Sequence, residues 1–140
     1  MITSRQCYIR YGAPEKESSM VLWDVPAELE IGVLPKRIYC NRDMVGPLEH
    51  AFRHLIARGF VDELRTWDGC FNIRKKKGGT STSLHAWGLA IDVNAAWNGF
   101  GKPPTLSSGF VKCFTDAGFD WGGAWGVRDG MHFQLSEFPA

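Results

Sequence analysis

Two histidines and one aspartate stand at positions from which their side chains could bind one metal ion. His85 and Asp92 flank the expected start of a strand, and His132 lies on the polar face of the last expected strand. Zinc binds imidazole nitrogen and carboxylate oxygen at about 2.0–2.2 Å, and a catalytic site leaves a fourth position for water. If the two strands pair, Asp92 and His132 come within reach of one ion, and His85 completes the triangle. The sequence therefore predicts a catalytic Zn²⁺ site.

An acid and a cation could complete a hydrolytic site around these ligands. Asp129 precedes His132 by three positions across the turn-forming Gly130. Its carboxylate is therefore expected near the metal without binding it, where it could take a proton from water and pass it to a leaving amine. Arg74 could neutralise an oxyanion or hold a substrate carboxylate.

Each of these residues has a commoner structural explanation when it is taken alone. A single histidine is more often a structural or surface residue, an aspartate at a strand edge usually makes a turn or a cap, and Asp-Gly usually forms a hairpin turn. The joint pattern is much rarer by chance, because two histidines and two acids all fall at the polar phase of an expected strand or turn. We therefore interpret the set as one site.

A basic run, Arg74-Lys75-Lys76-Lys77, precedes a flexible glycine- and serine-rich loop. Four cations in a loop most often form a solvated face. A carboxylate or other anionic ligand nearby is the sharper interpretation. The sequence leaves both open.

The elements that must position these side chains follow from hydrophobic periodicity. Residues 89–94 and 131–135 alternate between apolar and polar, which predicts strands with Asp92 and His132 on polar faces. The other elements expected are helices from Pro47 to Gly59 and from Leu106 to Ala117, strands at 60–67 and 119–121, and short strands or an ordered arm at 21–23 and 31–34. We predict a small α+β domain, with an antiparallel sheet packed against helices and the zinc site at one face of the sheet.

The length of 140 residues indicates a single domain. Residues 1–44 are expected to form an N-terminal arm of the same unit, and residues 45–140 the catalytic domain. The formal charge of +1 gives no long-range field for nucleic acid. No apolar run approaches the length of a transmembrane segment. We expect a monomer, made in the cytosol because the N-terminus lacks the pattern of a signal peptide, with four widely spaced cysteines as free thiols.

Three motifs resemble one known family. Residues 83–94, Ser-Leu-His-Ala-Trp-Gly-Leu-Ala-Ile-Asp-Val-Asn, are similar to the S-x-H-x-x-G-x-A-x-D signature of the D-alanyl-D-alanine carboxypeptidases, also called VanY or M15 peptidases. Residues 129–133, Asp-Gly-Met-His-Phe, resemble the later acid-x-x-His-aromatic motif of that family. Residues 69–74 resemble the segment that ends in its substrate-side arginine, and residues 119–125 its Gly-Gly-x-Trp run. The resemblance covers residues 45–135.

The resemblance implies a zinc peptidase acting on the peptides of bacterial peptidoglycan. It implies that His85, Asp92 and His132 bind zinc and that Asp129 is the general base. It further implies that Arg74 stabilises the tetrahedral intermediate and that Ser83 contacts the substrate carboxylate. Members of the family are D,D-carboxypeptidases, D,D-dipeptidases or L-alanyl-D-glutamate endopeptidases, and several are phage endolysins without a signal peptide. We therefore expect action on the cell wall after release, or as part of a virion.

Two positions depart from the pattern of the family. Gln134 stands where many members have Glu, which predicts an altered contact to a metal ligand. Asp129 stands where many members have the longer Glu, which moves the base by about one methylene. Neither change removes a ligand. The alternatives are a non-catalytic zinc-binding or wall-binding module on the same scaffold, or a wall-binding or virion-structural protein without metal.

Overall fold

The computed structural model describes residues 1–139, which leaves Ala140, the last residue of the expected catalytic domain, outside the described residues. Within this range the chain forms three α-helices and six β-strands, joined by short 3-10 turns. The helices are α1 (Ser4–Tyr11), α2 (Val45–Ala57) and α3 (Ser108–Thr115). The strands are β1 (Met20–Asp24), β2 (Arg37–Asn41), β3 (Trp67–Gly69), β4 (Ala90–Val93), β5 (Phe119–Trp121) and β6 (His132–Leu135).

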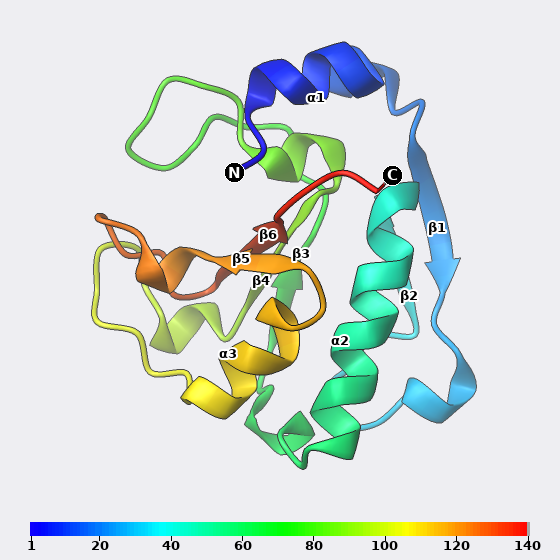
Figure 1. The fold of residues 1–140 in the computed structure, drawn as a ribbon, viewed down its shortest axis with the longest axis vertical. Coiled ribbons are helices and arrows are strands. Elements are labelled where there is room, and N and C mark those ends of the chain that lie inside the picture. The colour runs from blue at the N-terminus through cyan, green and yellow to red at the C-terminus, as the bar shows by residue number, and fades with distance from the viewer. Residues whose placement is uncertain (140) are drawn as a thin grey trace.

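Four strands form the central sheet in the order β3-β4-β6-β5, and every neighbouring pair is antiparallel. Strands β1 and β2 form a separate antiparallel ribbon. In Figure 1, α3 lies below the central sheet and α2 to its right, with β1 on the outer side of α2. This arrangement confirms the predicted α+β fold with an antiparallel sheet packed against helices.

The apolar face of the central sheet packs against α3. The ring of Phe133 in β6 lies 4.6 Å from that of Phe114 and 6.5 Å from that of Phe110, measured between centroids. All three rings are fully buried, as is Ile91 on the neighbouring strand. Because side chains alternate along a strand, burying these residues turns Asp92, His132 and Gln134 to the other face. The packing of the core therefore sets the direction of the candidate ligands.

The N-terminal arm packs against the segment that carries His85. The backbone N–H of Asn41 donates to the carbonyl of Gly88 at 3.1 Å, and the Asn41 side chain donates to the carbonyl of Trp87 at 3.0 Å. The indole N–H of Trp87 in turn donates to the carbonyl of Gly12 at 2.9 Å. One buried apolar cluster runs from Ile2 in the arm to Leu135 in β6. The arm and the rest of the chain thus share a core.

Gly88 has no room for a side chain. Its φ of +66° lies in the left-handed region, and a β-carbon there would come within 2.6 Å of the backbone nitrogen of Asn41. Glycine adopts this conformation without steric cost. The tight turn lets the chain pass from the His85 segment into β4 while β2 lies directly against it.

One expected strand is wrong. Residues 60–67 contain a 3-10 turn at Val61–Glu63, and only Trp67 belongs to β3. Of the two segments expected as short strands or an ordered arm, residues 21–23 lie in β1, whereas residues 31–34 form a turn with Gly32 at φ +61°. Leu34 and Leu64 are buried on irregular backbone, which periodicity alone cannot distinguish from a strand. Among the helices described between residues 1 and 139, none is sufficiently long and apolar for a membrane crossing.

Candidate metal centre

The pairing of two strands brings Asp92 and His132 together. Asp92 in β4 and His132 in β6 are directly opposite each other in the antiparallel register. His85 comes from the 3-10 turn Leu84–Trp87, which Ser83 caps by accepting a hydrogen bond from the backbone N–H of His85 at 3.2 Å. Two consecutive elements and a third from near the end of the chain therefore meet at the polar face of the sheet.

The donor atoms of the three residues lie within 4.8 Å of one another. His85 Nε2 is 3.1 Å from Asp92 Oδ2, and His132 Nδ1 is 3.5 Å from Asp92 Oδ1. Metal–ligand bonds of about 2.0–2.1 Å in a tetrahedral site separate the donor atoms by about 3.4 Å. The observed separations fit a single divalent transition-metal ion, for which imidazole and carboxylate are suitable ligands.

The second ring nitrogen of each histidine is already bound. His85 Nδ1 lies 2.7 Å from the carbonyl oxygen of Cys70, and His132 Nε2 lies 2.9 Å from Gln134 Oε1. Because both partners can only accept, each of these nitrogens carries the proton. The lone pairs therefore stand on His85 Nε2 and His132 Nδ1, the two atoms that face Asp92.

Buried polar atoms without partners indicate that this group is built for a ligand. His85 Nε2, Asp92 Oδ1 and His132 Nδ1 are buried and make no hydrogen bond within the described protein. Because each nitrogen presents a lone pair, its short contact with Asp92 is not a hydrogen bond and is unfavourable unless a cation lies between the two atoms. Buried polar groups in proteins are nearly always satisfied, so three orphaned donor atoms pointing at one another fit a bound cation.

The electrostatics of Asp92 favour its charged form. Burial raises the pKa of this carboxyl, but when a proton rather than a metal ion lies between Asp92 and the rings of His132 and His85, the hydrogen bonds and charge of those rings outweigh burial and hold the pKa well below its usual range. Asp92 therefore stays an anion. A metal-binding carboxylate must be ionised, which the surroundings of Asp92 provide.

Asp129 lies beside the ligands and is 6% exposed. Its backbone carbonyl accepts from the N–H of His132 at 3.0 Å, which closes the turn at Gly130. Its backbone N–H donates to Gly122, where a β-carbon would come within 2.5 Å of the Asp129 carbonyl oxygen. The buried atom Asp129 Oδ1 has no hydrogen-bond partner. The turn thus holds an uncommitted carboxylate oxygen beside the candidate metal ligands.

Arg74 and Ser83 also lie at this site. Arg74 Nη2 is 4.0 Å from Asp92 Oδ2, and Nη1 donates to the carbonyl of Lys75 at 3.0 Å. Ser83 is buried, and its hydroxyl oxygen accepts the capping hydrogen bond described above. All six residues predicted from the sequence are therefore near one another, although the direct partner of Ser83 is the backbone of His85.

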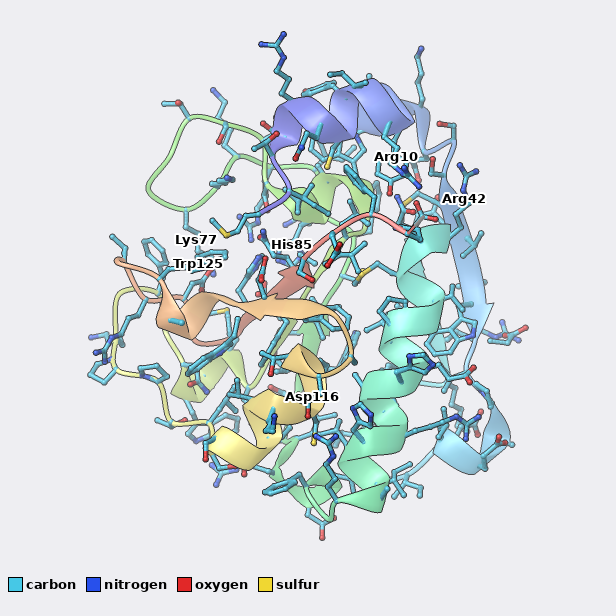
Figure 2. All side chains as sticks on the ribbon, in the orientation of Figure 1. Arg10, Arg42, Lys77, His85, Asp116 and Trp125 are labelled. Atoms are coloured by element: carbon cyan, nitrogen blue, oxygen red, sulfur yellow. The ribbon has the colours of Figure 1, made fainter. Side chains whose placement is uncertain are left out.

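A cavity of about 480 Å³ opens onto His132, one of the three candidate ligands. Its wall includes His132, Asp129, Arg74 and Ser83. Trp125 also lines it, with its ring centroid 5.3 Å from that of His132. Figure 2 shows Trp125 and Lys77 on the side of the molecule where the loops around residues 75–82, 98–105 and 124–130 project. The volume is typical of a small-molecule or peptide site.

Two features of the site were not predicted from the sequence. The carbonyl of Cys70 holds His85, but a backbone acceptor leaves no signature in residue types. The ammonium of Lys77 lies 3.8 Å from Asp129 Oδ1, and the basic run was its only signal in the sequence. Gln134, for which the sequence predicts an altered contact to a metal ligand, is the direct partner of His132.

The cysteines take no part in the metal site. All four are free and buried. Burial raises the pKa of Cys40 to about 12 and holds the pKa of Cys70 well above its usual value. Protonated thiols are poor ligands and poor nucleophiles, so the predicted free thiols are confirmed.

Replacing Gln134 with leucine is expected to weaken metal binding by about 10–100-fold, because outer hydrogen-bond partners orient ligating histidines. Leucine has a similar volume and no acceptor for His132 Nε2–H. Glutamate retains an acceptor, so Gln134→Glu serves as the matched control. The dissociation constant of Zn²⁺, measured by competition with a chelating dye, checks this. Equal constants for the wild type and the leucine variant would contradict the role assigned to Gln134.

Comparison with known proteins agrees with this geometry. Residues 76–135 match the family model of the M15 peptidases described as D-alanyl-D-alanine carboxypeptidase. The matched segment contains Ser83, His85, Asp92, Asp129 and His132, and Arg74 lies two residues before it. No curated protein and no solved structure gives a significant match. The family match confirms the resemblance and supports an M15 family peptidase.

Proposed function

We propose that this chain is a zinc-dependent peptidase that hydrolyses a bond in the stem or cross-link peptides of bacterial peptidoglycan. The observation that carries the proposal is the buried, unpartnered set of His85 Nε2, Asp92 Oδ1 and His132 Nδ1, with Asp129 Oδ1 beside it. The match to the D-alanyl-D-alanine carboxypeptidase model supports the substrate class. Two imidazoles and one carboxylate form a donor set that suits Zn²⁺ and leaves a position for water.

Zinc at such a site acts as a Lewis acid and lowers the pKa of water to about 7, so that a nucleophile is present at neutral pH. The residues of the chain supply the remaining functions. Asp129 Oδ1 makes no hydrogen bond, and the ammonium of Lys77 lies 3.8 Å away, so the carboxylate can accept a proton from the attacking water. The same carboxyl then returns the proton to the leaving amine.

Arg74 supplies a positive charge beside Asp92. Its guanidinium lies 4.0 Å from Asp92 and lines the cavity. From there it can stabilise negative charge that develops on the carbonyl oxygen of the substrate. Ser83 shares the wall, and its hydroxyl hydrogen is free to donate to a substrate carboxylate.

The shape of the surface favours an endopeptidase over a carboxypeptidase. A second, more open hollow of about 310 Å³ is lined by Gly101, Pro103, Gly126, Val127 and Arg128. It shares Val127 with the wall of the main cavity. A peptide chain can therefore extend from one hollow into the other, whereas a carboxypeptidase needs a site that ends at the substrate's C-terminus.

Purified muropeptides are expected to be cleaved at one peptide bond, with no cleavage after treatment with a chelator and restored cleavage after addition of Zn²⁺. Mass spectrometry of the products reports the bond and the metal dependence together. Products that lack only a C-terminal residue would identify a carboxypeptidase. Intact muropeptides with the zinc-loaded protein would favour a non-catalytic binding module instead.

A further inference from the structure

The basic run at residues 74–77 forms part of the cavity wall. Lys76 N–H donates to the carbonyl of Ser81 at 2.9 Å, and Ser83 N–H donates to the carbonyl of Arg74 at 2.9 Å. These bonds, with the bridge between Lys75 and Thr82, close a hairpin loop. Arg74, Lys76 and Lys77 line the cavity, whereas Lys75 does not. Three of the four cations therefore face a ligand site rather than forming only a solvated surface.

The ammonium of Lys77 lies at the catalytic end of this wall. Its Nζ is 3.4 Å from Met131 Sδ and 3.8 Å from Asp129 Oδ1. The second distance is too long for a hydrogen bond, and a thioether is a weak acceptor. The side chain of Lys77 is 33% exposed. Its ammonium therefore keeps strong donor capacity directed at the cavity.

The charges around the cavity are unbalanced. Three cations line it against one acid, Asp129, although the whole chain carries a formal charge of only +1. Asp92 is committed to the metal ligand group. Trp125, Phe100 and Val127 supply an apolar wall. This combination suits a peptide with a carboxylate close to aliphatic groups. The positive charge of the lysines and Arg74 attracts the carboxylate, and the apolar wall contacts the aliphatic groups.

We propose that Lys77 is a specificity-determining residue that binds a carboxylate of an anionic peptide substrate, separately from the charge that Arg74 supplies. This inference rests on the proposed peptidase function and goes beyond it, because it names the substrate chemistry. The ammonium is a point charge on a flexible stem, so it can follow a carboxylate that is adjacent to the scissile bond. Asp129 lies only 3.8 Å from Lys77, which places the bound carboxylate near the reacting bond.

The test compares two synthetic stem peptides that differ only in one carboxylate, free in one and amidated in the other. The wild type is expected to cleave the free acid with about tenfold higher kcat/KM, chiefly through a lower KM, as for one charged hydrogen bond. Lys77→Met keeps the apolar stem and removes the charge. It is expected to raise KM about tenfold more for the acid than for the amide, and so to abolish the discrimination.

Lys75→Met is the matched control, because Lys75 belongs to the same run but lies outside the cavity wall. It is expected to keep the wild-type preference. Retained discrimination in Lys77→Met would overturn the inference, as would an equal loss on both peptides, since that would indicate a role toward Asp129 alone. Equal cleavage of both peptides by the wild type would also overturn it. If the zinc-loaded wild type cleaves neither peptide nor muropeptides, the proposed function itself fails.

Discussion

Replacement of Asp129 by asparagine is expected to lower kcat by about 10²–10⁴-fold, the range that a positioned general base contributes. The amide has nearly the same shape, but it cannot accept a proton at neutral pH. Asp129 is not among the metal-ligand group, so the variant should still bind one equivalent of Zn²⁺. Steady-state kinetics on a muropeptide, together with elemental analysis, measure both quantities on the same preparation.

Two further variants serve as controls for the loss of activity in Asp129→Asn. Asp129→Glu restores a carboxylate on a longer arm and is expected to recover part of the activity. Asp62→Asn removes an exposed acid from the 3-10 turn at residues 61–63 and is expected to change nothing. A loss of less than about tenfold in Asp129→Asn would show that another group carries the proton.

Replacement of His132 by alanine is expected to abolish activity, with a loss of at least about 10³-fold, because without a bound metal ion the pKa of the attacking water stays at its much higher bulk value. The variant should also lose zinc at stoichiometric concentrations. Wild-type protein is expected to melt at a higher temperature when zinc is added, since a ligand that binds only the folded state stabilises it. The melting temperature of the variant should not respond.

His50 provides the matched control for this variant. It is an exposed histidine on α2, away from the polar face of the sheet. His50→Ala should keep one equivalent of zinc and full activity. Wall-lysing activity that survives in His132→Ala would exclude the proposed zinc peptidase.

The strands that are predicted by alternating apolar and polar residues are also the strands that contain Asp92 and His132. Residues 89–94 and 131–135 show period-two patterns, and pairing them places Asp92 opposite His132. The expected helix from Pro47 to Gly59 occurs as α2 at residues 45–57, and the expected strand at residues 119–121 is β5. These patterns are strong because one side of each element is buried in a common core.

Other features depend on contacts that residue types do not encode. Helix α1 was not expected, because its sequence is polar and short and it is fixed by a Thr3–Gln6 capping box and by contacts with Trp87. The partner of His85 is a backbone carbonyl, so any residue at position 70 could supply it. The position of Lys77 depends on how the hairpin loop folds back over the cavity, which a run of lysines does not specify.

The N-terminal arm contacts the turn that carries His85, so docking of the arm and cation binding at His85 are expected to be coupled. Asn41 donates hydrogen bonds to the carbonyls of Trp87 and Gly88, and the indole of Trp87 donates to the carbonyl of Gly12. Residues from the first third of the chain therefore fix the backbone that orients His85. Thermodynamic linkage makes this coupling reciprocal. If the docked arm increases the affinity for a cation, a bound cation stabilises the docked arm by the same free energy. If His85, Asp92 and His132 hold the proposed zinc ion, substitutions in the β1–β2 ribbon are therefore expected to change its affinity.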